Sequence, residues 1–244
     1  MRILCISDIH GNYPALKAVS DHFQESFDLI LNGGDTTVYG PFPNETIHWL
    51  RKNSALSILG NTDRHIRTLM SGRTFKKPGK AEKRLMYGWT VAELDPENKI
   101  WLWNQPLYRT VRIDRAASPL KKDLLLGMYH GSPDDPDEFL FADTPEKRFR
   151  AIADKNHHHI ITVGHSHSPF HKKIGGIHFV NPGSTGRMFD GNPQASCALI
   201  TLGTAVKVEH FRIPYPVELV IEKLDEQRLP LLYQEMYRLG RKLN

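Results

Sequence analysis

The sequence places a carboxylate and an imidazole two residues apart, directly after its first apolar run. The run covers residues 3–6, and the pair is Asp8 and His10. Such a run is typical of a buried strand, and residues two apart on an extended chain point to the same side. Ligands of α/β sheets bind at the carboxyl ends of strands. The pair could offer a metal ion one oxygen and one nitrogen, although a single Asp-x-His is so common that taken alone it is better explained as incidental.

Metal-competent side chains recur directly after four further apolar runs. These side chains are Asp35, Asn61, His130, His165 and His167, after the runs at residues 29–31, 56–59, 124–129 and 160–163. Chance explains any one of them, but it does not explain seven nitrogen or oxygen ligands at five strand ends. Carboxylate, amide and imidazole donors without a thiolate suit two hard or borderline divalent ions, and an Asp can bridge both. Paired ions of this kind activate a water for attack on phosphorus.

The elements that must position these ligands alternate between strand and helix. Strands are predicted at residues 3–6, 29–31, 56–59, 124–129, 160–163 and 177–180, and in a hairpin of residues 197–202 and 205–211. Helices are predicted from Asn12 to about residue 23, around residues 47–50, and at residues 144–155, 217–226 and 231–242. No repeat or low-complexity tract interrupts the chain. This pattern predicts a single α/β domain that spans residues 1–244.

The alternation lapses between roughly residues 64 and 112, where short helices are expected. We interpret this segment as a small cap inserted into the domain. It contains a basic stretch, made up of Arg73, Lys76, Lys77, Lys80, Lys83 and Arg84. A solvated loop is the simpler interpretation of such a stretch, and a basic border of the ligand-bearing crevice is the alternative.

Composition restricts the cellular setting and the partners. At 244 residues and 40% hydrophobic content the chain can bury one full core. Two cysteines, Cys5 and Cys197, make a disulfide framework improbable, and no run is apolar enough for a signal peptide or a membrane span. We therefore predict a cytoplasmic protein with no membrane partner. A net charge of +5 favours anionic partners, such as a small phosphorylated substrate or a nucleotide, and leaves nucleic acid open. The sequence does not indicate an oligomeric state.

The motif series resembles the calcineurin-like metallophosphoesterases, in their compact bacterial and archaeal branch. The motifs that carry the resemblance are, in chain order, Asp8-x-His10, Gly34-Asp35, Gly60-Asn61-x-Asp63, His130 and Gly164-His165-x-His167. Other segments look like a subgroup of phosphodiesterases or diadenosine-tetraphosphatase-like proteins: Tyr39-Gly40-Pro41, His130-Gly131-Ser132-Pro133 and Asn181-Pro182-Gly183-Ser184. The resemblance covers nearly the whole chain.

The resemblance implies a fold and a site. The fold would be a four-layer αββα sandwich of mixed α/β (α+β) class with a small helical cap. The first metal would be held by Asp8, His10, Asp35 and His167, and the second by Asp35, Asn61, His130 and His165. Mn²⁺ is the expected ion, with Fe, Ni²⁺ and Zn²⁺ as alternatives. Asp35, Asn61 and His130 are assigned to catalysis, and Asn12, Thr62 and Arg187 to substrate binding.

One position departs from the family pattern. Many relatives carry a histidine where this chain has Thr62, and that histidine can protonate the leaving group. A hydroxyl is a poor acid near neutral pH, so the task is either missing or moved to His65, whose simpler interpretation is an exposed helix residue. Arg187 could pair with substrate phosphate, or lie on the surface. The remaining histidines are interpreted as structural: His157, His158 and His159 at a helix end, and also His171 and His178.

The sequence therefore predicts a binuclear-metal phosphoesterase that hydrolyses a phosphodiester or a phosphoanhydride, for example a dinucleoside polyphosphate, by attack of a metal-bridging hydroxide. A phosphomonoesterase that uses the same ligands is the enzymatic alternative. A protein-interaction scaffold with the same fold is the alternative from another class. Loss of ligands would favour the scaffold, and no ligand is lost here.

Overall fold

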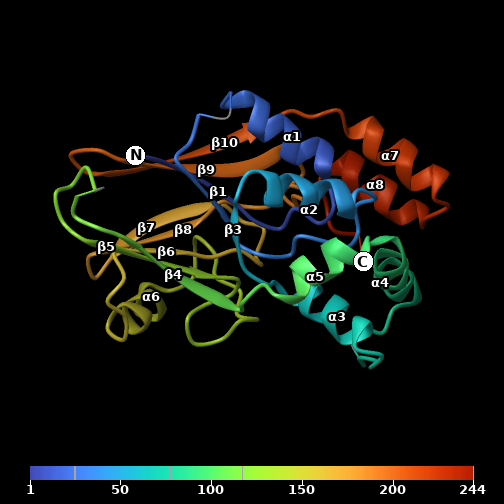
Figure 1. Cartoon of the computed structure of the whole chain (residues 1–244), viewed down its shortest axis with the longest axis horizontal. Coiled ribbons are helices and arrows are strands. Elements are labelled where there is room, and N and C mark those ends of the chain that lie inside the picture. Colours follow the sequence, from blue (N-terminus) through green and yellow to red (C-terminus); the bar gives the residue numbers. More distant parts are fainter. Residues whose placement is uncertain (25, 77, 117, 244) are drawn as a thin grey trace.

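Two sheets lie one over the other at the centre of the molecule (Figure 1). The computed structural model describes residues 1–244 except residues 25, 77, 117 and 244. Among these residues the first sheet has the order β10-β9-β1-β2-β3, and the second has the order β4-β5-β6-β8-β7. The first sheet contains β1 (Arg2–Ile6), β2 (Leu29–Asn32), β3 (Leu56–Ser57), β9 (Ala195–Leu202) and β10 (Val206–Ile213). The second contains β4 (Tyr108–Ile113), β5 (Leu124–Tyr129), β6 (Ile160–Thr162), β7 (Phe170–Ile174) and β8 (Ile177–Asn181).

Side chains along β1 alternate between two hydrophobic cores. Ile3 and Cys5 belong to a core that also includes Leu126 and Met128 of the second sheet, so they point between the sheets. Leu4 and Ile6 belong to a core shared with α1 (Tyr13–His22) and α2 (Pro43–Lys52). Because successive strand residues face opposite sides, an uninterrupted apolar run indicates burial on both faces. This is why β1 lies in the middle of its sheet.

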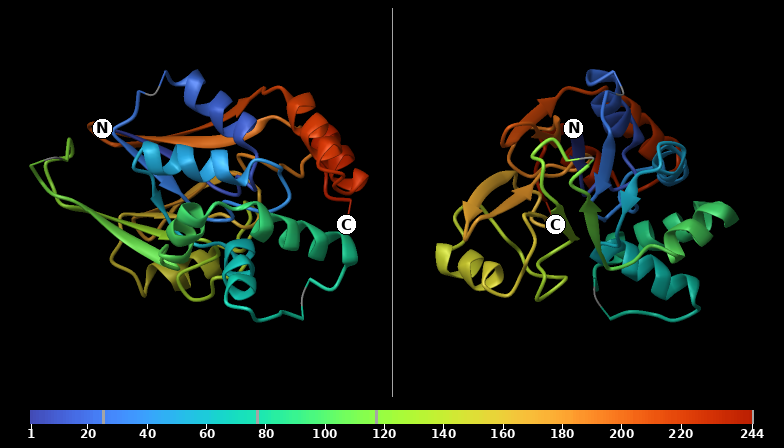
Figure 2. Two further views of the ribbon diagram at one scale, coloured as in Figure 1. Left: turned by 45° about the vertical axis from the view of Figure 1, so that its right-hand side comes forward. Right: turned by 60° about the vertical axis from the view of Figure 1, so that its left-hand side comes forward.

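Helices cover the outer face of each sheet. α1 and α2 cover the first sheet, and α6 (Glu146–Ala153) packs Phe149 and Ile152 against the second. The order of layers is therefore helices, sheet, sheet, helices, as the two views of Figure 2 also show. The predicted four-layer αββα sandwich is confirmed.

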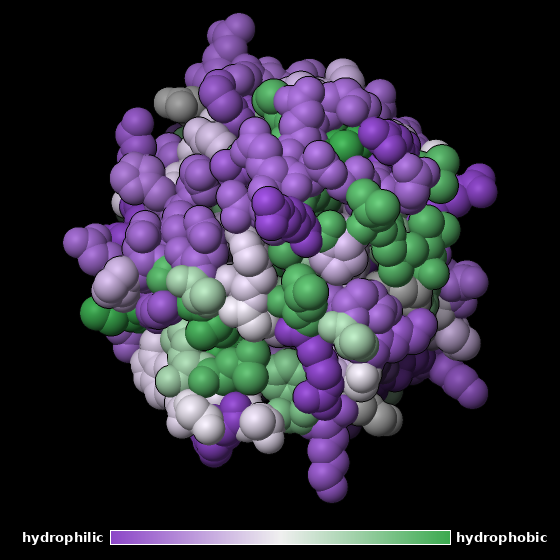
Figure 3. Space-filling view, turned by 90° about the vertical axis from the view of Figure 1, so that its right-hand side faces the viewer, coloured by the Kyte–Doolittle hydropathy of each residue, from purple (hydrophilic) through white to green (hydrophobic). Residues whose placement is uncertain are grey.

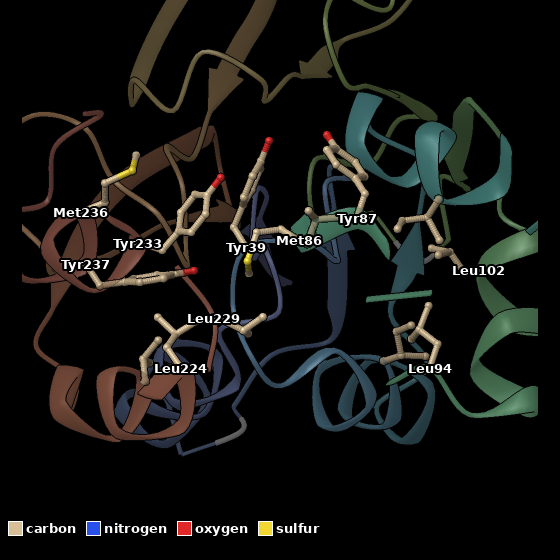
Figure 4. Close-up of a cluster of buried hydrophobic side chains, with 14 of the residues drawn as sticks. Tyr39, Met86, Tyr87, Leu94, Leu102, Leu224, Leu229, Tyr233, Met236 and Tyr237 are labelled. Carbon is tan, nitrogen blue, oxygen red and sulfur yellow. The ribbon is translucent and has the colours of Figure 1, made fainter. Parts of the chain in front are cut away.

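Five more helices gather at one end of the sandwich, beyond the carboxyl ends of β1 and β2 (Figures 1 and 2). Three lie in the segment interpreted as the cap: α3 (Asn61–Met70), α4 (Ala81–Glu93) and α5 (Pro96–Trp103). The other two are α7 (Val217–Glu226) and α8 (Leu231–Leu239). Cap and C-terminal helices share one core, in which Tyr39 lies between Tyr233 of α8 and Tyr87 of α4 (Figure 4). The cap is thus packed firmly against the end of the chain.

The structure corrects several predicted boundaries. β4 pairs antiparallel with β5, so residues 108–112 belong to the second sheet rather than to the cap, and the first cap helix begins at Asn61 rather than near residue 64. β7 was not predicted, because only alternate residues of that edge strand are shielded. α6 ends at Ala153, so His157, His158 and His159 lie beyond it and do not terminate it. Among the described residues, no helix is long and apolar enough to cross a membrane.

Candidate metal centre

The predicted ligands meet at one end of the sandwich. β1, β2 and β3 run parallel in the first sheet, and β5, β6 and β8 run parallel in the second, so the segments after these strands are brought to the same edge. Two groups of side chains result, and the ligand atoms within each group lie within 4.8 Å of one another. The groups are Asp8, His10 and His167, and Asp35, His130 and His165. Asn61 lies beside the second group, 3.1 Å from His130 Nε2 through its Oδ1 atom.

A turn from the second sheet locks the first ligand loop of the first sheet. The Ser184 hydroxyl donates to the Asp8 carbonyl at 2.7 Å, and the Thr185 N–H donates to the Ser7 carbonyl at 2.9 Å. Gly186 follows, and a Cβ there would come within 1.8 Å of the Ile9 carbonyl oxygen. Only glycine permits this approach of the two backbones. The Asn-Pro-Gly-Ser segment therefore holds the two halves of the site in register.

Five of the predicted ligands have a left-handed backbone. Their φ angles are 52° at Asp8, 53° at His10, 50° at Asp35, 64° at His165 and 55° at His167. Residues other than glycine rarely adopt this conformation, and each instance costs roughly 1–3 kcal/mol. Such strain persists only where surrounding contacts hold it, and it concentrates at functional sites. Here it turns the side chains of three loops toward one another.

Lone pairs face one another in the first group. His10 Nδ1 lies 3.4 Å from the Thr37 carbonyl, and His167 Nδ1 lies 2.5 Å from the Arg187 carbonyl. Because a carbonyl only accepts, each neutral ring carries its proton at Nδ1 and leaves Nε2 bare. The two Nε2 atoms are 3.3 Å apart, and His167 Nε2 is 3.2 Å from Asp8 Oδ1, a buried oxygen without a hydrogen-bond donor. A cation at this point would satisfy all three atoms.

The second group repeats this arrangement. His130 Nδ1 donates to the Gly33 carbonyl at 2.9 Å, so its Nε2 is the bare nitrogen that faces Asn61 Oδ1. If the Asn61 amide were turned over, its nitrogen could donate to His130 Nε2, His165 Nδ1 and Asp35 Oδ2, at 2.9 to 3.2 Å. These three acceptors thus converge on one position. A divalent cation explains the convergence as well as an amide nitrogen does, and it leaves Asn61 Oδ1 as a fourth ligand.

Electrostatics set the protonation state that a metal requires. Burial lowers the pKa of His10 and His130, and lowers that of His165 to about 4. Burial acts to raise the pKa of Asp8, but the neighbouring imidazoles in their charged forms, His167 before His130 and His10, outweigh burial and leave the carboxyl below its ordinary range. These imidazoles are thus neutral near pH 7, and Asp8 is ionised. Neutral imidazole and carboxylate are the forms that bind metal ions.

Asp35 predicts a pH dependence of metal binding. Burial and the Asp8 charge raise the pKa of Asp35 to about 6, above the 3.8 of an ordinary aspartate. Below pH 6 Asp35 is protonated, so the metal must displace a proton to bind. The protonated carboxyl also stabilises the metal-free fold, because a group with a raised pKa contributes stability that is lost as the pH rises through that pKa. We therefore expect the rise in Tm produced by Mn²⁺ to shrink as the pH falls through 6. Thermal unfolding with and without Mn²⁺ between pH 5 and pH 8 measures it, and a constant rise would contradict this role of Asp35.

The structure gives Asn12 a different task from the predicted contact with phosphate. Its Oδ1 accepts the Ala15 N–H at 3.1 Å and so caps α1, while Nδ2 donates to the Gly186 carbonyl at 2.8 Å and to the Tyr215 hydroxyl at 3.1 Å. The side chain is fully buried, and its donors and acceptor are used. An Asn at this position is needed to begin α1 and to hold Gly186, so its presence after the first motif fits a structural role as well as a contact with phosphate.

A cavity of about 540 Å³ opens over the two groups. Of the predicted site residues, it is lined by His10, Asp35, Asn61, Thr62, His165, His167 and Arg187. Asp8 and His130 lie beneath it and are buried. A larger cavity of about 1010 Å³, between α2 and α5, contains none of the predicted ligands. The smaller cavity is therefore the candidate active site.

Two residues differ from their simpler sequence interpretation. Arg187 is not a surface residue: it is 8% exposed and lines the cavity. His65 is half-buried rather than exposed, with Nδ1 2.7 Å from the Asn61 carbonyl and its ring against Phe75 and Tyr87. It also lines the cavity. Both side chains are therefore placed to meet a substrate.

The sequence reasoning missed two aromatic residues beside the ligands. The Phe139 ring is stacked on His165 with centroids 4.0 Å apart, and the Phe189 ring is stacked on His167 at 4.4 Å. Both line the cavity, and Phe139 is 54% exposed. An aromatic residue within a polar segment next to a ligand motif was the available signal. Stacking fixes the two imidazole planes and supplies apolar walls for a substrate.

Comparison with known proteins agrees with this geometry. A family model for the calcineurin-like phosphoesterase superfamily domain matches residues 1–205. An uncharacterised protein of Methanocaldococcus jannaschii is 31% identical over 257 aligned positions, which cover 98% of each chain. A metallophosphoesterase from Sphaerobacter thermophilus has a TM-score of 0.79 and 26% identity, covering 98% of this chain and 99% of the other. A hypothetical protein from Pyrococcus horikoshii, 19% identical over 99% of both chains, shares the fold with a TM-score of 0.84.

These matches extend over most or all of the chain, and the ligand groups described above are complete in it. The chain therefore belongs to the calcineurin-like phosphoesterase superfamily and is a metal-dependent hydrolase.

Proposed function

We propose that this protein is a binuclear-metal phosphoesterase that hydrolyses a phosphodiester or a phosphoanhydride, such as a dinucleoside polyphosphate. The observation that carries the proposal is the convergence of proton-free ligand atoms in two adjoining groups below one cavity. Nitrogen and oxygen donors without a thiolate fit Mn²⁺, which we propose as the ion, with Fe, Ni²⁺ and Zn²⁺ as alternatives. Bound ions of this kind supply Lewis-acid charge and lower the pKa of a bound water.

Asp35 is the residue that would serve both ions. Its Oδ2 atom lies 3.8 Å from His10 Nε2 in the first group, and its Oδ1 atom lies 3.6 Å from His130 Nε2 in the second. The first ion would also be held by Asp8, His10 and His167, and the second by Asn61, His130 and His165. This assignment is the one that the family resemblance implies.

Residues behind the ligands orient them. The Thr62 N–H donates to Asp35 Oδ1 at 2.8 Å and so fixes the bridging carboxylate. Asp8 Oδ2 accepts from the Ser7 hydroxyl at 2.6 Å and from the His165 N–H at 3.1 Å, which leaves Oδ1 free for an ion. Such supporting hydrogen bonds fix ring and carboxylate geometry in metal sites. The chain thus supplies a pre-organised site.

The charge of the metal centre, counted without the cations around it, supports a diester or an anhydride over a monoester. Two divalent ions, the carboxylates of Asp8 and Asp35 and a hydroxide leave roughly one positive charge, which a monoanionic phosphoryl group neutralises. We further propose that the substrate is a small phosphorylated molecule, with nucleic acid kept open as a substrate.

Location in the cytoplasm is supported by Cys5 and Cys197, which are buried free thiols on neighbouring strands.

Metal content is the first test. We expect purified protein reconstituted with Mn²⁺ to contain about two ions per chain, because seven ligands form two adjoining sites. Elemental analysis after gel filtration measures the ratio. His167→Ala should lower it toward one, and the exposed His157→Ala should leave it unchanged. A folded protein with a ratio near zero would contradict the enzyme proposal and favour a scaffold.

A substrate panel is the test of the reaction. After chelator treatment, the protein is assayed with Mn²⁺, Fe²⁺, Ni²⁺, Zn²⁺ and Mg²⁺ against an aryl phosphodiester, a dinucleoside polyphosphate and an aryl phosphomonoester. We expect the highest kcat/KM for the diester or the anhydride. A preference for the monoester would replace the proposal by the phosphomonoesterase alternative.

A further inference from the structure

We propose that Arg187, Lys83 and Lys242 form a second anion site beside the metal centre, and that this site selects substrates with a phosphoryl group beyond the one that is hydrolysed. The inference rests on the proposed function and narrows it to phosphoanhydrides such as nucleoside polyphosphates. The three residues come from the turn after β8, from α4 and from the segment after α8. All three line the cavity over the metal centre.

Arg187 carries a buried charge that no carboxylate of the described residues neutralises. Its side chain belongs to a residue that is 8% exposed, and its Nε atom is buried with no hydrogen bond. The hydrogen-bond contact found for the guanidinium is between Nη2 and Met236 Sδ, at 3.5 Å. Among the described residues, no carboxylate forms an ion pair with it. A buried unpaired charge lowers the stability of the fold, so its presence points to an anion that comes from outside.

Aromatic rings hold this guanidinium in place. Arg187 Cζ lies 4.0 Å from the centroid of the Tyr39 ring and 5.1 Å from that of Phe189. Tyr39 in turn packs edge-on against the metal ligand His10, at 5.4 Å, and lies beside Tyr233 (Figure 4). Rings stabilise the charge through their faces and leave the N–H groups free to donate. A guanidinium fixed in this way is pre-organised for the two oxygens of a phosphoryl group.

Two lysines add charge at the same cavity. Lys83 is half-buried, and its pKa is lowered first by burial and then by the charges of Lys242 and Arg187. None of the three forms an ion pair with a carboxylate in the described part of the chain. Three like charges around one cavity repel one another, and a bound polyanion would relieve the repulsion. The face of the molecule at this end carries both hydrophilic and hydrophobic residues (Figure 3).

Only part of the basic stretch takes part in this site. Lys83 lines the cavity, whereas the exposed Lys76 and Lys80 do not, and Lys77 lies outside the described residues. Arg84 donates to the carbonyls of Phe75 and Lys76 and so orders the preceding loop. Among the described residues of the stretch, Lys83 is the one that lines the cavity, together with Arg187 and Lys242 from two other segments.

The chemistry of the two subsites defines the substrate class. The metal centre, with roughly one positive charge, takes the phosphoryl group that is hydrolysed. Three further cations fit a second phosphoryl group joined to it through an anhydride oxygen. A simple aryl diester has nothing to place there. Polyphosphates are therefore expected to gain binding energy that diesters do not.

Anion binding without metal is the direct test. Chelator-treated protein is heated with equal concentrations of orthophosphate or tripolyphosphate, so that chelation of Mn²⁺ by the probe plays no part. We expect tripolyphosphate to raise the Tm more than orthophosphate in the wild type, and this difference to disappear in Arg187→Gln. Lys80→Gln, with the same loss of charge on an exposed side chain, should retain it. Equal Tm shifts for the two anions in the wild type would overturn the inference.

Selectivity of the loaded enzyme is the second measurement. We expect kcat/KM for a dinucleoside polyphosphate, divided by kcat/KM for an aryl diester, to fall about 10- to 100-fold in Arg187→Gln. The ratio falls because charge-assisted hydrogen bonds to the second phosphoryl group are lost. Because an unpaired buried charge is removed, the variant should unfold at the same or a higher Tm when metal-free. Lys83→Gln is a second test, at a side chain that is only half-buried. An unchanged ratio in both variants would overturn this inference alone, whereas a loaded wild type that hydrolyses neither substrate would overturn the proposed function with it.

Discussion

Asp35→Asn is expected to abolish nearly all activity, with a fall in kcat of roughly 10³-fold or more. The carboxylate contacts both ligand groups, so its loss weakens both ions at once and leaves their mutual repulsion less compensated. Charge stabilisation by metal ions is worth several kcal/mol, and each 1.36 kcal/mol is about tenfold in rate. Elemental analysis and kcat at saturating Mn²⁺ measure the effect.

The same substitution has the opposite effect on the metal-free fold. At pH 8 Asp35 is ionised, and its raised pKa means that this ionised carboxyl destabilises the buried site. Asparagine removes the charge and can still accept the Thr62 N–H. We therefore expect metal-free Asp35→Asn to be at least as stable as metal-free wild type, but to gain less Tm from Mn²⁺. Asp21→Asn on the exposed face of α1 is the matched control. A fully active Asp35→Asn with His130→Ala inactive would show that the bridging assignment is wrong.

The fold was predictable where the sequence pattern has one physical cause. β1 and β5 are buried on both faces, so their apolar runs identify them, and the polar residues after them mark their carboxyl ends. β7 has the burial pattern of an edge strand and contains His171, Lys172 and Lys173, so its sequence looks like a loop. β4 is exposed at alternate positions and was assigned to the cap for the same reason. Edge strands depend on a neighbour that the local sequence does not reveal.

The site was predictable to the level of its ligands and not of its surroundings. Asp8, His10 and the others share a local rule, a polar residue after an apolar run, and this rule identified them as ligands. Their division into two groups was implied by the family resemblance, and the structure brings two such groups together. The environment of Arg187 depends instead on Tyr39 and Tyr233, which come from distant segments. No spacing in the sequence indicates that a surface-type residue will be buried there. Contacts between distant segments decide whether such a residue is solvated or functional.

Thr62 predicts a strong dependence on the leaving group. Its hydroxyl donates to the Thr37 carbonyl at 3.3 Å, and the residue is 2% exposed, so it offers no acidic proton to a substrate. General acid catalysis is worth about 10²- to 10⁴-fold and matters most when the departing oxygen is a strong base. We expect aryl diesters and phosphoanhydrides to be hydrolysed at least about 10²-fold faster than unactivated alkyl diesters. The values of kcat/KM for matched aryl and alkyl esters measure this ratio.

His65 is the only described imidazole at the cavity that is outside the two ligand groups. Its Nδ1 atom lies 2.7 Å from the Asn61 carbonyl, so the neutral ring carries its proton there and leaves Nε2 bare. A bare nitrogen accepts a proton and cannot give one to a leaving group. His65 could therefore serve as an acid only in its charged form, which requires protonation of Nε2.

Two variants test whether the site lacks a general acid or uses His65 as one. Thr62→His should raise alkyl-ester kcat/KM selectively and narrow the aryl-to-alkyl ratio, because its imidazole would supply an acid at this position. The aryl ester serves as the internal control, since a change in metal loading affects both substrates alike. If instead the wild type hydrolyses both esters at similar rates with chemistry rate-limiting, an acid is already present, and a selective loss of alkyl activity in His65→Ala would identify it.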